Sequence, residues 1–228
     1  LRVHRLPELP VYSAMQVIFV YRADVASGND DGNETNEGNM PNVTLAPLEG
    51  IDREQFIADN QKAFNYGALE EFGLRDNHFE EDGQIISRAT IEGCLDGGTA
   101  YRILADGEKV GGLVLRFSED GSRGECELLF VNPDEHGKSV GTKAWTAVER
   151  LYPNVKVWEL VTPYFEKRNI HFYVNVLGFH IVEFFNSHHP APSDDPEIGS
   201  ASGENSEEHL GHEDSNDEMF RFEKVMRR

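Results

Sequence analysis

The sequence has few cysteines and no long apolar run. Cys94 and Cys126 are its two cysteines, and they fit neither a disulfide framework nor a CxxC metal site. We interpret them as buried or half-buried thiols of a protein in the reducing cytoplasm. No apolar run approaches the ~20 residues that span a bilayer. The apolar stretch 11–21 is diluted by Tyr12 and Gln16 and no A-x-A site follows it, which disfavours a secretory signal.

Basic residues are also scarce relative to acidic ones. The chain has 21 Lys and Arg against 41 Asp and Glu, a formal net charge of −20. Residues 186–218 alone contain ten acidic residues and no Lys or Arg, whereas residues 40–185 contain 24 acidic and 14 basic residues. Such a surface repels nucleic acid and anionic membranes and favours cationic or amine-bearing partners. We therefore expect no nucleic-acid partner and no membrane partner.

The length of 228 residues is typical of one domain with extensions. Residues 22–39 are polar, acidic and rich in Gly and Asn, a composition that does not bury enough apolar surface to order itself. We predict an N-terminal extension over 1–39 with one candidate strand at 15–21. The compact domain covers 40–228, with an acidic flexible insertion at 186–218 between its last two strands.

Hydrophobic periodicity and turn residues predict a mixed α/β domain with the order β-α-α-β-β-β-α-β-α-β-β. The first helix is expected to be capped by Asp52 and to run to about residue 72. The predicted strands are 43–48, 99–106, 109–118, 125–132, 155–162, 180–185 and 219–226. The other predicted helices are 87–95, a helix that follows the glycines near 140 and ends at 152, and 166–179.

The stretch VNPDEHGKSVGTKAW (131–145) contains Gly137-Lys138-Ser139, the end of the nucleotide-triphosphate loop G-x-x-x-x-G-K-[ST]. The first glycine of that loop is replaced by Asn132, and Asp134 and Glu135 would repel a triphosphate. NTP hydrolysis is therefore disfavoured. A strand that enters a glycine-flanked helix still directs unsatisfied N–H groups and a helix dipole toward an anion. An ordinary strand–helix turn is the alternative.

Two stretches resemble motifs of one family. FVNPDEHGKSVGTKAW resembles motif A, [QR]-x-x-G-x-[GA], of the GNAT superfamily of acetyl-CoA-dependent N-acetyltransferases. TPYFEKRNIHFYVNVLGFHIVE resembles the later signature N-x-x-x-F-Y-x-x-x-G-F of that family, with one extra residue before Gly178. The resemblance implies the GNAT fold over about 42–226, an α/β (α+β) domain whose mixed central sheet of about six to seven strands is flanked by about four helices. His136 departs from the usual Gln or Arg, and Ser139 replaces the first motif glycine.

The resemblance also implies a binding site for acetyl-CoA, used as co-substrate, and no metal. The main-chain N–H groups around the motif are expected to hold the pyrophosphate, from residues His136, Gly137, Lys138, Ser139, Val140, Gly141 and Thr142. The main chain of Val131 would pair with the pantetheine arm, and N–H groups near Phe130 and Val131 would stabilise the oxyanion. Asn169 would contact the cofactor.

Tyr173 is the residue that the resemblance assigns as general acid. Asn169 and Tyr173 are four residues apart and share one face of the later helix. A phenol with a pKa of about 10 suits a leaving thiol with a pKa of about 8.5. The alternative is a core tyrosine, because Ile170, Val174 and Leu177 share that side of the helix.

Glu125 and Glu127 are candidates for the base that takes the proton of the amine. Alternation places them on one face of their strand together with Leu129 and Val131. The alternative is two solvated charges near the sheet margin. Glu159, in an otherwise apolar strand, is a third candidate, and water suffices if no residue is required.

The predicted function is transfer of an acetyl group from acetyl-CoA to a primary amine, of a small amine, a polyamine or a protein. A non-catalytic coenzyme A-binding module is the alternative, motivated by His136 and Ser139. The resemblance leaves a homodimer open. His209-x-x-His212 has chelating spacing, but it lies in a solvated charge run without ordered flanking elements or cysteines, so no metal site is predicted there.

Overall fold

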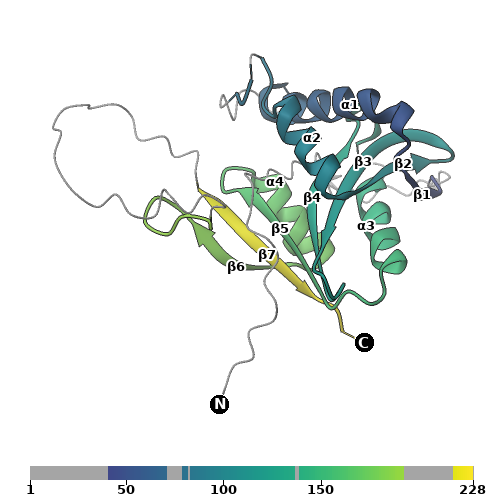
Figure 1. Ribbon diagram of the computed structural model, residues 1–228. Helices are drawn as coiled ribbons and strands as arrows, with labels where there is room; N and C mark the ends of the chain where they lie inside the picture. The colour runs from purple at the N-terminus through teal and green to yellow at the C-terminus, as the bar shows by residue number, and fades with distance from the viewer. Residues whose placement is uncertain (1–40, 71–78, 82, 137–138, 193–217, 228) are drawn as a thin grey trace, which may run out of the picture.

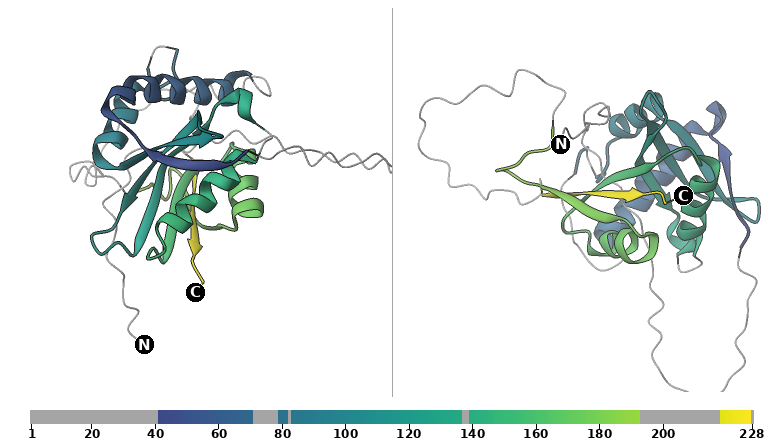
Figure 2. Two further views of the ribbon diagram at one scale, coloured as in Figure 1. Left: turned by 90° about the vertical axis from the view of Figure 1, so that its right-hand side faces the viewer. Right: turned by 90° about the horizontal axis from the view of Figure 1, so that it is seen from below.

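The computed structural model describes residues 41–70, 79–81, 83–136, 139–192 and 218–227. The described chain forms one mixed seven-stranded sheet in the order β1-β2-β3-β4-β5-β7-β6, with helices packed on both faces (Figures 1 and 2). The strands are β1 Val43–Pro47, β2 Thr99–Ala105, β3 Glu108–Phe117, β4 Arg123–Val131, β5 Val157–Pro163, β6 His180–Phe185 and β7 Met219–Val225. The α-helices are α1 Arg53–Asn65, α2 Arg88–Gly97, α3 Val140–Leu151 and α4 Lys167–His171. Short 3-10 or π segments are η1 Gly50–Asp52, η2 Tyr66–Glu70, η3 Pro133–Glu135 and η4 Phe172–Leu177.

This order of strands and helices confirms the predicted one. The β2–β3 hairpin closes through Asp106 and Gly107, whose φ angles of 51° and 93° are those of a tight turn with left-handed residues. The candidate strand at 15–21 and most of the acidic insertion lie outside the described residues.

The predicted start of α2 is confirmed, whereas the predicted cap of α1 is wrong. The Ser87 hydroxyl accepts a hydrogen bond from the Thr90 N–H at 3.0 Å and begins α2. Asp52 precedes α1 but makes no capping bond. Its carboxylate accepts instead from Arg102 at 2.6 Å and lies 2.9 Å from Lys109, because the buried guanidinium of Arg102 requires a counter-charge.

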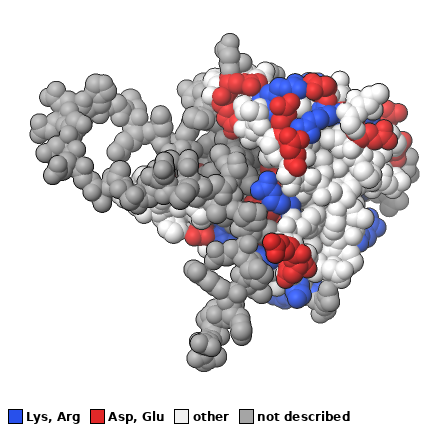
Figure 3. Space-filling view, in the orientation of Figure 1, with Lys and Arg blue, Asp and Glu red and all other residues white. Residues whose placement is uncertain are grey.

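Two apolar cores, one on each face, hold the helices to the sheet. On one face α1 and α2 cover Val114, Leu128 and Phe130. On the other, α3 and η4 cover the central strands, and Trp145 of α3 packs edge-on against Trp158 of β5 at 5.3 Å between ring centroids. The left view of Figure 2 shows these two layers. Figure 3 shows basic and acidic side chains interleaved over the α1–α2 end.

β4 and β5 pair over only part of their length. Their parallel ladder includes Arg123↔Val157, Gly124↔Trp158 and Glu125↔Glu159 and then stops. Beyond that point β5 continues to pair with β7, and β4 with β3. From residue 126 to 131, the edge of β4 that faces β5 therefore has no strand partner among the described residues.

A bulge in β4 changes which side chains share a face. Leu115 pairs with Cys126 and Val114 with Leu128, so Glu127 is the extra residue. Arg116, the cross-strand partner of Glu125, packs its guanidinium against Gly97 of α2. Both carboxylates therefore lie on the α1–α2 face, whereas Leu129 and Val131 belong to the core on the α3 side. Glu125 and Glu127 thus share a face as predicted, whereas the prediction that Leu129 and Val131 share it with them was wrong, because the bulge reverses the alternation after Glu127.

Candidate active site

The predicted site residues that the structure describes gather where β4 leaves β5. Phe130 and Val131 end β4, and η3 and α3 follow. Tyr173 of η4 approaches β4 from the α3 side, in the same core as Cys126. The carboxylates of Glu125 and Glu127 lie on the opposite face. Gly137 and Lys138, also predicted for pyrophosphate binding, lie outside the described residues.

The N-terminus of α3 has no side-chain cap from Ser139. The first main-chain bond of this turn runs from the Lys143 N–H to the Ser139 carbonyl at 3.1 Å. The N–H groups of Val140, Gly141 and Thr142 precede that bond, at the positive end of the helix dipole. This arrangement suits an anion such as a phosphate.

Ser139 adopts a left-handed backbone with φ 56° and ψ 19°. A residue with a Cβ is strained there by about 1–2 kcal/mol, whereas glycine is not. Glycine also loses more entropy on folding, so we expect Ser139→Gly to raise the free energy of unfolding by about 0.5–1 kcal/mol, measured by urea denaturation. Ser139→Ala keeps the strain and serves as the control. A Gly variant less stable than the Ala variant would contradict the assignment.

His136 folds back onto the end of β4. Its Nε2 lies 3.1 Å from the carbonyl oxygen of Val131, and its ring lies 5.9 Å from the ring of Tyr66. The carbonyl predicted to face a pantetheine arm thus already has one partner. A carbonyl oxygen has two lone pairs, so this contact leaves room for a second donor.

Tyr173 is fully buried among aromatic rings. Its centroid lies 6.1 Å from Phe179 and 5.7 Å from Phe222. Burial, reinforced by Cys126 and Glu166, raises the pKa of its phenol well above the usual value, so the group carries its proton at any physiological pH. The same shift makes it a weaker acid than the phenol with a pKa of about 10 on which the sequence prediction relied. The extra residue before Gly178 is absorbed by the π-helical turn η4, as a one-residue insertion into a helix requires.

Asn169 lies one turn before Tyr173, in α4, and is also fully buried. The predicted pair therefore stays together on the sheet side of this helix. Core packing and a role toward a ligand are both compatible with that position.

The carboxylates of Glu125 and Glu127 are each only 1% exposed. Burial raises the pKa of Glu127 to about 7, although the Arg116 guanidinium, 2.5 Å from its Oε1, works in the opposite direction. Burial and then the charges of Glu127 and Glu159 raise the pKa of Glu125 to about 8. The alternative of two solvated charges is therefore wrong. A carboxylate that titrates near neutrality is suited to accept a proton there.

Glu159 has a different environment. Arg123 donates to it at 2.6 to 3.0 Å, and Arg221 at 2.9 Å. Glu183 and Glu223 extend this network through Arg221. Both oxygens of the Glu159 carboxylate are therefore engaged in ion pairs with guanidinium groups.

Two residues of this region were not singled out from the sequence. Arg116 holds Glu127, and Asn60 of α1 is buried beside Phe56 and Phe64. The signal in the sequence for Arg116 was a charged residue in the strand that pairs with the strand of Glu125. An asparagine within the apolar stripe of an amphipathic helix was the signal for Asn60.

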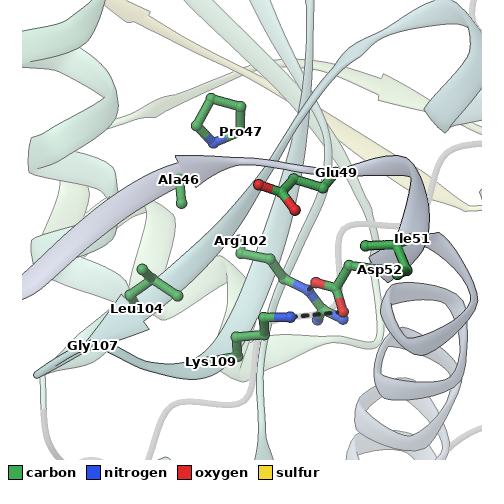
Figure 4. A pocket seen from close by; sticks show the side chains of 9 residues that line it. All are labelled: Ala46, Pro47, Glu49, Ile51, Asp52, Arg102, Leu104, Gly107 and Lys109. Atoms are coloured by element: carbon green, nitrogen blue, oxygen red, sulfur yellow. Dashed lines mark hydrogen bonds and ion pairs between the residues drawn. The ribbon is translucent and has the colours of Figure 1, made fainter.

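A pocket of about 420 Å³ lies elsewhere, between β1, β2, β3 and the start of α1 (Figure 4). Three of its charged side chains form ion pairs: Asp52 pairs with Arg102 and with Lys109, and Arg102 also bonds to Asp59 outside the lining. None of the predicted site residues that the structure describes lines it.

Metal and membrane features were searched over the described ranges. In 41–192, with its gaps, and 218–227, no group of three or more His, Cys, Asp and Glu could hold a metal ion. No helix in that part of the chain is long and apolar enough to cross a membrane.

Residues 58–179, more than half of the chain, match the model of the Acetyltransferase (GNAT) family. The chain belongs to the GNAT acetyltransferases. A curated relative, Uncharacterized protein YrkN of Bacillus subtilis (strain 168), is 38% identical over 192 residues, covering 83% of this chain and 97% of that protein.

Solved GNAT-type structures share the fold at low identity. The ribosomal-protein-S18-alanine N-acetyltransferase of Escherichia coli aligns with a TM-score of 0.53 at 13% identity, covering 80% of this chain and 93% of that one. An acetyltransferase from Thermus thermophilus aligns with a TM-score of 0.54 at 14% identity, covering 82% of this chain and 99% of that one. The predicted GNAT fold is confirmed.

Proposed function

We propose that this chain transfers an acetyl group from acetyl-CoA directly to a primary amine. The proposal rests on the side chains that lie around the point where the pairing of β4 with β5 stops. A phenol that keeps its proton lies on one face of the sheet there, and two carboxylates that titrate near neutrality lie on the other. A GNAT acetyltransferase needs these two functions around a bound thioester.

Acetyl-CoA fits the start of α3 and the end of β4. The uncapped N–H groups of Val140, Gly141 and Thr142 would bind its pyrophosphate, together with His136, Ser139 and the two residues between them. The edge of β4 that lacks a described strand partner would pair with the pantetheine arm, and Val131 would supply an N–H group to the acyl oxygen. The Phe130 N–H, predicted for the same role, points toward β3, because Phe130 pairs with Gly112 two residues before the hydrogen bond from Asn132 to Val110.

The reaction balances with the residues present. The amine nitrogen attacks the thioester carbonyl carbon while a carboxylate takes one N–H proton. Glu127 is the better base, since Arg116 orients it and its pKa of about 7 leaves it ionised at slightly alkaline pH. The C–S bond then breaks, and Tyr173 gives its proton to the departing thiolate. The products are an N-acetyl amine and the free thiol of coenzyme A, and transfer of a proton from Glu127 through solvent to the Tyr173 phenolate restores both residues.

The acceptor is proposed only as a class. The acidic surface favours a cationic amine, whether a small amine, a polyamine or a protein amine. Cys94 and Cys126 are free and buried, in keeping with action in the reducing cytoplasm. A homodimer remains part of the proposal, without a defined interface.

The test is release of free thiol from acetyl-CoA across a panel of small amines, polyamines and peptides, with binding of coenzyme A measured by calorimetry. We expect turnover with at least one amine and a matching mass gain of one acetyl group on that amine. Tight binding of coenzyme A without turnover on any amine would favour the non-catalytic binding module.

A further inference from the structure

Asn60 is a fully buried polar residue whose amide makes no hydrogen bond within the described chain. It is 0% exposed, and neither its Oδ1 nor its Nδ2 has a partner among the residues that the structure describes. The other buried residues of its helix stripe are apolar: Phe56, Ile57, Ala63 and Phe64. Leaving a buried amide unbonded is costly, and native proteins bond nearly all such groups. An external partner for this amide would account for its presence.

Two ring contacts locate Asn60 along the sheet. The ring of Phe56 lies 5.1 Å from that of Phe130, and the ring of Tyr66 lies 5.9 Å from that of His136. α1 therefore runs from above the end of β4 toward the turn that follows it. Asn60 lies between these contacts, about 6 Å along the helix from Phe56 at a rise of about 1.5 Å per residue. This places it above residues 130–136, the segment proposed to hold the acyl group.

Asn60 shares its face of the sheet with the candidate bases. α1 and α2 cover this face, and the carboxylates of Glu125 and Glu127 lie on it. One oxygen of each carboxylate, Oε1 of Glu125 and Oε2 of Glu127, is likewise buried without a hydrogen-bond partner in the described part of the chain. Polar atoms without a hydrogen-bond partner thus lie along the α1–α2 face of β4, and the apolar side chains of Leu128 and Phe130 lie between them.

We propose that Asn60 is a catalytic residue that binds the reacting centre. Its Nδ2 donates a hydrogen bond to the acyl oxygen, and its Oδ1 accepts one from an N–H of the attacking amine. An amide has both a donor and an acceptor, and the reacting pair presents the complementary acceptor and donor. A ligand that offered only a carbonyl, or only an ammonium, would leave either Oδ1 or Nδ2 of Asn60 without a hydrogen bond. This inference rests on the proposed acetyl transfer.

The test replaces Asn60 by leucine, which has a similar volume and no polar atom. Removing a buried unbonded amide should raise the Tm by about 3 °C. Removing a donor to the oxyanion should lower kcat by about 10²- to 10³-fold, with the Kd for acetyl-CoA unchanged. Asn60→Met repeats the test with an unbranched side chain. Gln55→Leu makes the same chemical change on the exposed side of α1 and should alter neither kcat nor the Kd.

Three outcomes would overturn the proposal. A higher Tm with unchanged kcat would make Asn60 an unbonded core amide or the holder of an internal water. Weaker acetyl-CoA binding with unchanged kcat would place it against the coenzyme arm. If the wild-type protein itself acetylates no amine, the proposed function fails, a result distinct from an active wild type with an equally active leucine variant.

Discussion

Replacing Tyr173 with phenylalanine should lower kcat by about 10²- to 10⁴-fold, the usual contribution of a general acid. The variant loses one hydroxyl inside an aromatic cluster, so the ring contacts with Phe179 and Phe222 remain. The Kd for acetyl-CoA should change little, because the hydroxyl is required only when the thiolate leaves. Stopped-flow thiol release and calorimetry on the same preparation separate the two effects.

Tyr164→Phe is the matched control for this substitution. Tyr164 is 47% exposed at the end of β5, and loss of its hydroxyl should leave kcat unchanged. Tyr173→Phe with a wild-type kcat would remove Tyr173 as the acid and return it to a core role. Loss of acetyl-CoA binding in that variant would likewise contradict the assignment.

Replacing Glu127 with glutamine should lower kcat/KM for the amine by about 10²- to 10⁴-fold and remove one ionisation from its pH profile. The pKa of Glu127 is raised to about 7, and the base acts only when ionised, so wild-type kcat/KM should rise with pH through about 7. In the variant this rise disappears, and only the titration of the amine itself remains. The measurement is kcat/KM from pH 5.5 to about 9 with one amine.

Glu54→Gln makes the same change on an exposed side chain that pairs with Arg88, and its profile should match the wild type. If Glu127→Gln keeps the rise near pH 7 and Glu125→Gln loses it, the base is Glu125. If both variants keep the rise and the rate, water is sufficient, and neither carboxylate is catalytic.

The sequence was most informative where a local pattern has a local cause. Alternating residues predicted the strands. The predicted helix 87–95 begins where the Ser87 hydroxyl accepts a hydrogen bond from the helix N–H three residues later. The extra residue before Gly178 was visible in the sequence. Its accommodation as the π turn of η4 was not, since it depends on Tyr173 and Leu177 both keeping their core contacts.

The sequence placed the candidate carboxylates on β4 but not on the correct face. The bulge at Glu127 depends on the register with β3, which no pattern within β4 reveals. At the start of α1, the partner of Asp52 was likewise not visible in the local sequence. A helix-capping residue in the sequence instead binds a buried arginine from β2, fifty residues away, because an unpaired buried charge is costlier than an unfilled cap.

The sequence by itself determined the order of the elements, the glycine-flanked turn before α3, the family and the residue types available for acid–base chemistry. Those follow from short-range backbone geometry and from motifs whose residues are close in the chain. Only the tertiary structure decided that β4 leaves β5 after Glu125, that Glu125 and Glu127 are buried with raised pKa values, and that Asn60 has no partner among the described residues. Burial and register depend on residues distant in the chain, so desolvation and pairing, and the chemistry that depends on them, appear only after folding.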